Sequence, residues 1–198
     1  MTTVIAITGG IGSGKSTFSK EVIKRGYKLL DSDKEVAYMY DKPKKAFINH
    51  LRKIGLEKAI QKNKIDKSII ANEIFSNSKI KHKLEEYIFK LIRLKRDKFI
   101  KSEKKKKTKI VFLDIPLLFE NNLHKNFDIV ISIISVRKLR YLRLKKNKGM
   151  KKEMFEKILK NQTTDIERKK KSDIVIFNNE SLRKFLEKTS VFFKTMNL

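Results

Sequence analysis

Gly9-Gly10-Ile11-Gly12-Ser13-Gly14-Lys15-Ser16 decides the fold of this chain, because it matches every fixed position of the phosphate-binding loop G-x-x-x-x-G-K-[ST]. The apolar run Val4-Ile5-Ala6-Ile7 before it predicts a buried strand, and the unbroken stretch from Thr17 to Lys24 after it predicts a helix. A strand, a glycine loop and a helix in this order are the context that the loop requires. The stretch therefore predicts an α/β protein that binds a phosphorylated ligand.

The loop is expected to bind phosphate mainly through its backbone. Glycines let the chain turn tightly and aim successive N–H groups at one point, and the following helix adds the positive end of its dipole. Lys15 can reach the β- and γ-phosphates of ATP as a point charge, and the Ser16 hydroxyl can ligate Mg²⁺. The residues expected to bind ATP are Gly10, Ile11, Gly12, Ser13, Gly14, Lys15, Ser16 and Thr17.

The composition narrows the class of protein. A chain of 198 residues suits one domain, or one core that carries insertions. It contains no cysteine, which excludes disulfides and thiolate metal sites, and no apolar run long enough to span a membrane. The N-terminus leads directly into the first strand without the pattern of a secretion signal. We expect a cytoplasmic protein, a monomer or weak homo-oligomer, with no membrane partner.

The net charge of +27 invites comparison with nucleic-acid-binding proteins. Its cations are mostly Lys and are spread along nearly the whole chain, whereas surfaces that read phosphates also favour planar Arg. The pattern favours a solvated surface and predicts no nucleic-acid partner. Such a surface would still attract anionic substrates.

Five segments are expected to form buried strands of a parallel sheet, because their apolar runs do not alternate with polar residues. They are Thr3–Thr8, Lys28–Leu30, Ile110–Asp114, Ile129–Ile134 and Ile174–Phe177. Helical patterns separate them, as α/β winding requires. The sequence thus predicts an α/β fold with a five-stranded parallel sheet behind the phosphate-binding loop.

Two insertions interrupt the predicted sheet. The longer one, between the second and third strands, carries apolar residues at helical spacing. They are Ile69, Ile70, Ile74, Phe75, Leu84, Tyr87, Ile88, Leu91, Ile92 and Leu94. This insertion leaves the sheet at its carboxyl edge, where ligands bind in open α/β sheets. The second, Arg137 to Lys160, is basic and helical with a turn at Asn147-Lys148-Gly149, and it predicts a mobile lid.

Asp31-Ser32-Asp33 follows the short second strand directly. A carboxylate at the carboxyl end of that strand is well placed to orient, and to deprotonate, an acceptor hydroxyl in phosphoryl transfer. The alternative is that an Asp here only caps the next helix, which starts near Lys34. Both roles can coexist, and we assign Asp33 to the chemistry.

Asp114 ends the third strand, Ile110-Val111-Phe112-Leu113-Asp114. An apolar strand that ends in an acid is the Walker B arrangement, in which the carboxylate helps to hold Mg²⁺. The alternative is an ordinary turn residue at a strand end. Ser16 and Asp114 together are the predicted Mg²⁺ site.

Arg140 and Arg143 lie three residues apart on one face of the presumed lid helix. Either arginine could close on the transferring phosphate. A solvated face is the alternative for both of them in a chain so rich in Lys.

With these segments placed, the chain resembles the dephospho-coenzyme A kinase family nearly from end to end. The family's T-G-G-I-G-S-G-K-S stands at Thr8–Ser16, its D-x-D at Asp31–Asp33 and its P-L-L-F-E at Pro116–Glu120. A family Gln and Arg before the last strand match Gln162 and Arg168, and A-D-x-V-I-x-N matches Ser172–Asn178. The loop alone is shared by many families, whereas this combination at these spacings is specific.

The resemblance implies an ATP-dependent kinase that phosphorylates the ribose 3′-hydroxyl of dephospho-coenzyme A, the last step of coenzyme A synthesis. It implies a P-loop kinase core in residues 1–33, 108–136 and 161–198, a helical substrate-binding insertion that binds the acceptor in 34–107, and a helical lid in 137–160.

Individual roles follow from the same resemblance. Asp33 would be the base toward the 3′-hydroxyl, and Arg143 would be a lid arginine that meets the ATP phosphates. Arg168 and Asn178 would line the adenine of ATP.

The chain departs from the family at four places, where the acceptor and lid contacts are expected to differ. Ala37 lies where an Arg often follows D-x-D, and Ile88-Phe89-Lys90-Leu91-Ile92 lacks the His and Pro of I-L-H-P-L-I. Asn147 replaces a second lid arginine, and Glu180 stands where a Gly is expected.

Two other functions remain open at this point. A kinase for another nucleotide or nucleoside monophosphate would share every feature of the loop, because acceptor choice lies in the insertion. A P-loop protein that binds nucleic acid would need an Arg- and aromatic-rich patch, which the diffuse Lys pattern does not indicate.

Overall fold

A computed structural model describes residues 1–62 and 64–196 and divides the chain into two compact units. We call Met1–Leu30 with Glu103–Leu198 the core unit, and Asp31–Ser102 the helical unit. The core unit contains the phosphate-binding loop, and the helical unit corresponds closely to the longer predicted insertion.

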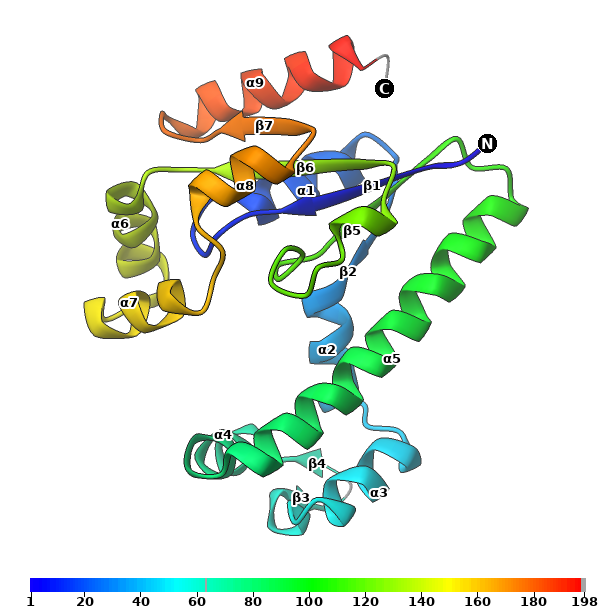
Figure 1. Ribbon diagram of the computed structural model, residues 1–198, viewed down its shortest axis with the longest axis vertical. Coiled ribbons are helices and arrows are strands. Elements are labelled where there is room, and N and C mark those ends of the chain that lie inside the picture. Colours follow the sequence, from blue (N-terminus) through cyan, green and yellow to red (C-terminus); the bar gives the residue numbers. More distant parts are fainter. Residues whose placement is uncertain (63, 197–198) are drawn as a thin grey trace. The chain divides into compact units, whose positions relative to one another are not determined.

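The elements follow the expected alternation (Figure 1). The strands are β1 Thr3–Thr8, β2 Lys28–Asp31, β3 Ile60–Gln61, β4 Lys64–Ile65, β5 Ile110–Asp114, β6 Ile129–Ile134 and β7 Ile174–Phe177. The first helices are α1 Lys15–Lys24, α2 Ser32–Asp41, α3 Lys45–Lys53, α4 Lys67–Ser76 and α5 Ser78–Lys105. The later ones are α6 Arg137–Lys148, α7 Lys152–Lys160, α8 Asp165–Lys171 and α9 Leu182–Thr195, with short 3-10 turns at Glu57–Ala59 and His124–Asn126.

All five predicted strands are present and form one sheet in the order β2-β5-β1-β6-β7. β1 pairs in parallel with β5 on one side and with β6 on the other, and β6 pairs in parallel with β7. The predicted parallel α/β fold is therefore confirmed. β1 is the central strand, so the loop that follows it opens at the carboxyl edge, where such sheets bind ligands.

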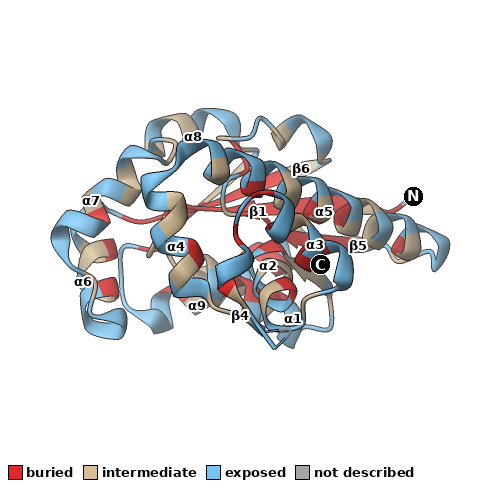
Figure 2. Ribbon diagram, turned by 90° about the horizontal axis from the view of Figure 1, so that it is seen from below, coloured by how far each residue is buried: buried red, intermediate tan, exposed pale blue. Residues whose placement is uncertain are grey.

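The central strands are largely apolar because helices cover the sheet. Ile5 and Ile7 of β1 are fully buried and pack with Phe18 of α1 and Phe193 of α9 in one cluster. α8 contacts β6, and the buried residues in Figure 2 run along β1 and β6. This packing gives the loop a rigid base.

The helical unit has a hydrophobic core of its own. Its buried members come from α2 to α5 and the turn between them, and they are Met39, Phe47, Leu51, Ile54, Leu56, Ala59, Ile70, Leu84 and Ile92. The predicted helices are confirmed, although Phe75 and Leu94 of the same apolar pattern are 80% and 56% exposed. The antiparallel pair β3–β4 was not predicted, because two-residue strands are too short to show an alternating pattern.

The predicted lid segment forms two helices, α6 and α7. α6 continues through Asn147 and Lys148, which the sequence suggested as part of a turn, and ends at Gly149. Gly149 adopts φ +60°, the left-handed conformation that ends many helices and that glycine adopts without strain. Movement of this segment stays a prediction.

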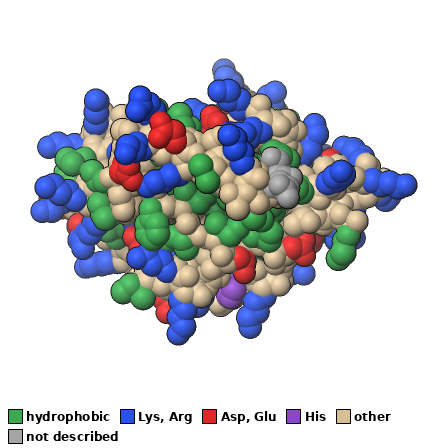
Figure 3. All heavy atoms as spheres, turned by 90° about the horizontal axis from the view of Figure 1, so that it is seen from above, with side chains coloured by type: hydrophobic (Ala, Val, Ile, Leu, Met, Phe, Trp, Pro, Cys, Tyr) green, Lys and Arg blue, Asp and Glu red, His purple; other side chains and the backbone are tan. Residues whose placement is uncertain are grey.

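Lys and Arg side chains occur all around the face drawn in Figure 3 and do not gather at one place. This distribution agrees with the spread of Lys along the sequence. Within residues 1–62 and 64–196, no helix combines the length and the apolar character needed to cross a bilayer.

Candidate active site

The phosphate-binding loop connects β1 to α1 and has the backbone shape that its glycines predict. Gly12 and Gly14 adopt φ +73° and +103°, which other residues rarely adopt. Gly14 is the N-cap of α1, and its carbonyl accepts hydrogen bonds from the amides of Thr17 and Phe18 at 3.0 and 3.2 Å. The positive end of the helix dipole therefore lies at the loop, where an anion is favoured.

Lys15 and Asp114 form an ion pair at the carboxyl ends of neighbouring strands. Asp114 ends β5 opposite Ile7 of β1, so the strand register brings it beside the loop. Asp114 is 1% exposed, and its carboxylate also accepts a hydrogen bond of 2.7 Å from the Ser19 hydroxyl. Asp114 is thus a partner of the loop lysine and not an ordinary turn residue. Ser16, the other predicted Mg²⁺ ligand, is exposed in the first turn of α1.

Asn178 and Arg143 lie together behind the loop. The Asn178 side-chain amide donates to the Ser13 carbonyl at 2.8 Å, and a Cβ on Gly14 would stand only 2.1 Å from its nitrogen. Arg143 donates to the backbone and side-chain oxygens of Asn178 at 2.9 and 3.2 Å, and to the Ser135 hydroxyl at 3.1 Å. Burial lowers the pKa of Arg143. The structure brings these two predicted residues into contact with each other, and their nucleotide contacts stay predictions.

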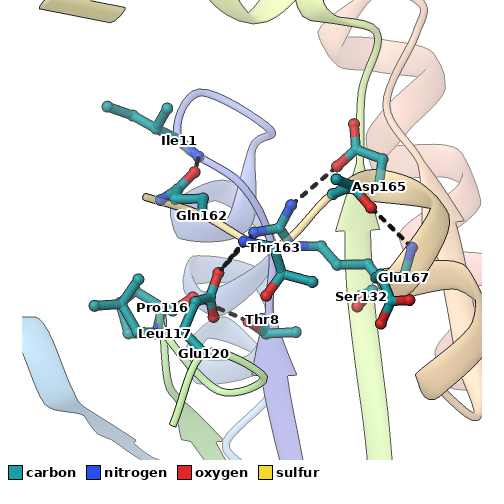
Figure 4. A network of polar contacts seen from close by, with 12 residues as sticks. Thr8, Ile11, Pro116, Leu117, Glu120, Ser132, Gln162, Thr163, Asp165 and Glu167 are labelled. Carbon is teal, nitrogen blue, oxygen red and sulfur yellow. Dashed lines mark hydrogen bonds and ion pairs between the residues drawn. The ribbon is translucent and has the colours of Figure 1, made fainter. Parts of the chain in front are cut away.

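A network of two arginines and two carboxylates lies beside the loop, and Figure 4 shows the part of it around Glu120 and Asp165. Arg168 donates to Asp165 at 3.1 Å and to Glu120 at 3.2 Å, and Arg140 donates to both Asp165 oxygens at 3.1 and 3.3 Å. Glu120 also accepts the backbone amide of Thr163 at 2.6 Å. Arg168 and Arg140 are 1% and 3% exposed. These two buried cations are matched by two anions, as buried charges require.

Local sequence explains how Asp165 reaches this network. Thr164 is the N-cap of α8, and its hydroxyl accepts the amide of Glu167 at 3.2 Å. Thr and Glu three residues apart are the signature of a helix start. Asp165 thus enters the first turn of α8, where a carboxylate is favoured by the helix dipole and Arg168 is one turn away.

The tip of the loop is held from both sides. The Ile11 amide donates to the Gln162 side chain at 3.0 Å, and the Ile11 carbonyl accepts from Arg140 Nε at 2.9 Å. The alternative that Arg140 and Arg143 lie on a solvated face is wrong, since Arg140 is buried and Arg143 is half-buried. Arg168, which the resemblance places at the adenine, lies wholly within the network, and its nucleotide contact stays a prediction.

Asp33 belongs to the helical unit and is exposed in the first turn of α2. The cap of that helix is Asp31, whose carboxylate accepts the amide of Lys34 at 3.1 Å. The capping role therefore falls to Asp31, and a catalytic role for Asp33 stays a prediction.

The four departures from the family lie on helices or at a helix start. Ala37 is in α2, Phe89 is half exposed in α5 and Asn147 is in the last turn of α6. Glu180 precedes α9 and pairs with Lys184 and Lys188. Glu180 thus has partners of its own on the following helix.

Sequence reasoning missed the partners of the predicted residues. Ser19 lies four residues after Lys15, on the same face of α1, which is a signal that periodicity could have used. Asp165 carried a similar local signal, because it follows the helix-start pattern of Thr164 and Glu167 and lies three residues before Arg168, whereas Glu120 gave none because its partners lie on other elements.

The comparisons with known proteins agree with this geometry. The family model for dephospho-CoA kinase matches residues 3–184. The chain is 36% identical to a dephospho-CoA kinase of Fusobacterium nucleatum over 98% of each chain. In structure it is similar to a dephospho-CoA kinase of Campylobacter jejuni, with a TM-score of 0.74 and 27% identity over 99% and 98% of the chains. It is also similar to TT1252 of Thermus thermophilus, with a TM-score of 0.80 and 25% identity over 98% and 96%.

Proposed function

The chain belongs to the dephospho-CoA kinase family and transfers a phosphoryl group from ATP to dephospho-CoA, and from this premise we propose that the acceptor is the ribose 3′-hydroxyl. We also propose the following roles for the residues described above. The observation that carries the roles proposed for the phosphate-binding loop is the ion pair of Lys15 with Asp114.

Lys15 and the loop amides hold the ATP phosphates. Lys15 exchanges Asp114 for the β- and γ-phosphates when ATP binds, because the phosphates carry more negative charge than one carboxylate. This exchange frees Oδ1 of Asp114, while Oδ2 keeps its hydrogen bond from the Ser19 hydroxyl. The Asp114 carboxylate and the Ser16 hydroxyl are oxygen donors of the kind that Mg²⁺ prefers and would hold the ion, which would supply neutralisation of the phosphate charge.

Asp33 orients the 3′-hydroxyl and accepts its proton as the oxygen attacks the γ-phosphate in line. Its place in the first turn of α2, two residues after the end of β2, supports this role, since a group on a helix is held more precisely than one on a loop. The helical unit, close to the predicted range 34–107, carries the acceptor-binding surface in this proposal.

Residues 137–160 act as the lid. Arg143 contributes positive charge near the transferring phosphoryl group, and closure excludes water, which limits wasteful hydrolysis of ATP. Arg143, in the middle of α6, is anchored on Asn178, so we expect α7 to move more than the part of α6 around Arg143.

An acceptor panel tests the proposal. Purified protein with Mg-ATP is offered dephospho-CoA, AMP, CMP or no acceptor, and ADP release is followed in a coupled assay. We expect kcat/KM for dephospho-CoA to exceed that for either nucleotide by a factor on the order of 10² or more, because a site built for a larger acceptor leaves polar groups unpaired with a smaller one. The reaction without acceptor measures hydrolysis alone.

The panel also separates the alternatives. Rapid turnover of AMP or CMP with no turnover of dephospho-CoA would assign the chain to another nucleotide kinase activity. ADP release that is the same with and without every acceptor would contradict a kinase.

A further inference from the structure

The environment of Arg140 is unusual, because burying a charged guanidinium costs free energy. Its Nε donates to the Ile11 carbonyl and its NH1 to Asp165, whereas its NH2 is buried with no hydrogen-bond partner among the described residues. Burial lowers the pKa of the guanidinium, and Asp165 opposes this effect. A buried charged group with an unsatisfied donor is a poor way to fill space, since an apolar side chain of similar size avoids the penalty. The residue therefore calls for a role beyond packing.

The guanidinium also lies against the backbone of the loop. A Cβ on Gly10 would stand 2.7 to 2.8 Å from Arg140 NH2, Cζ and NH1, and such nearly equal distances place it over the flat face of the guanidinium. A Cβ on Gly12 would stand 2.8 Å from the Arg140 carbonyl. Arg140 thus contacts three consecutive loop residues, Gly10, Ile11 and Gly12.

These contacts fix the loop at one peptide. Gln162 holds the Ile11 amide and Arg140 holds the Ile11 carbonyl, so neither peptide group beside Ile11 can rotate freely. The amides that follow this point are the ones expected to meet the phosphates. Their direction depends on the conformation of residues 10–12, since a peptide rotation there would turn an N–H away from the ligand.

We propose that Arg140 is a positioning residue for phosphoryl transfer, which is held by Asp165 and fixes the Ile11 peptide so that the loop amides stay aimed at the ATP phosphates. The proposal rests on ATP as the occupant of the loop. It predicts that Arg140 affects the binding of ATP and does not affect the binding of dephospho-CoA.

Two variants test the hydrogen bonds directly. Arg140→Gln removes both the charge and the planar guanidinium. We expect the Kd of a fluorescent ATP analogue, measured without acceptor, to rise about 10-fold or more. The KM for ATP rises in parallel, while the KM for dephospho-CoA stays within about two-fold. Arg140→Lys keeps the charge, but its ammonium cannot bind Ile11 and Asp165 as a planar guanidinium does. We therefore expect an intermediate loss of ATP affinity.

A double variant separates positioning from charge. Arg140→Gln alone leaves one carboxylate of the network unbalanced, and Arg140→Gln with Asp165→Asn restores the balance. If Arg140 acts by position, ATP affinity stays low in the double variant. Recovery of wild-type affinity there would show that only the charge matters and would overturn the proposal.

The control is Arg183→Gln on α9, whose side chain is 85% exposed and paired with Glu187. It should leave both KM values unchanged. Thermal unfolding is measured for every variant, and Arg140→Lys carries the test if the glutamine variant does not fold. Unchanged ATP affinity in a folded Arg140 variant, or an equal rise of both KM values, would contradict the proposal. Failure of the wild type to use dephospho-CoA would instead contradict the function and leave the ATP comparison valid.

Discussion

Replacing Lys15 by alanine will reduce phosphoryl transfer to dephospho-CoA by a factor on the order of 10³ or more. The structure holds this ammonium at the loop, in an ion pair with a carboxylate at the end of the neighbouring strand. No other cation is fixed at the same point by the described contacts, and diffuse surface Lys cannot replace a positioned charge. Steady-state turnover with saturating dephospho-CoA measures the loss.

Two controls accompany this variant. Lys20→Ala changes an exposed lysine of the same helix and should keep wild-type turnover. Removal of Lys15 leaves the buried Asp114 with Ser19 as its partner, so thermal unfolding is measured and activity is assayed well below the midpoint. A folded Lys15→Ala protein with near-normal turnover would remove the loop lysine from the mechanism.

Asp33→Asn will lower kcat by about 10²-fold or more while ATP affinity stays unchanged. Asparagine keeps the size and polarity of the side chain but cannot accept the proton of the hydroxyl. The α2 helix keeps its start, because the cap is made by Asp31. Turnover and the Kd of a fluorescent ATP analogue are measured on the same preparation.

Asp41→Asn is the matched control for this variant, since Asp41 is an exposed carboxylate at the end of the same helix and pairs with Lys67. It should leave turnover within about two-fold. Near-normal kcat in Asp33→Asn, or loss of ATP binding as the whole effect, would show that Asp33 is not the base.

The sheet and the loop could be predicted because their signals are local. Continuous apolar runs such as Ile110–Asp114 occur where a parallel strand is covered on both faces, and the loop motif has fixed spacing. The order of the strands brought Asp114 beside Lys15, as the Walker B interpretation requires.

Most partners of the buried charges could not be predicted because they are long-range, whereas Arg168 and Asp165 lie three residues apart on one helix. Arg140 meets Ile11 and Asp165 across 129 and 25 residues, and a sequence with 49 basic residues gives no sign of which cations are buried. Phe75 is the opposite case: it is an apolar residue in a helical pattern, and yet it is exposed and not part of the core. Burial of these residues is decided by tertiary packing, which periodicity does not reveal.

The position of the new phosphate on the product tests the central proposal most directly. Dephospho-CoA is converted with Mg-ATP, and phosphorus–proton correlation NMR identifies the ribose proton coupled to the new phosphomonoester. We expect coupling to the proton at the 3′ carbon and to no other ribose proton. A phosphate at the 2′ position, or no product from dephospho-CoA while another nucleotide is phosphorylated, would contradict it.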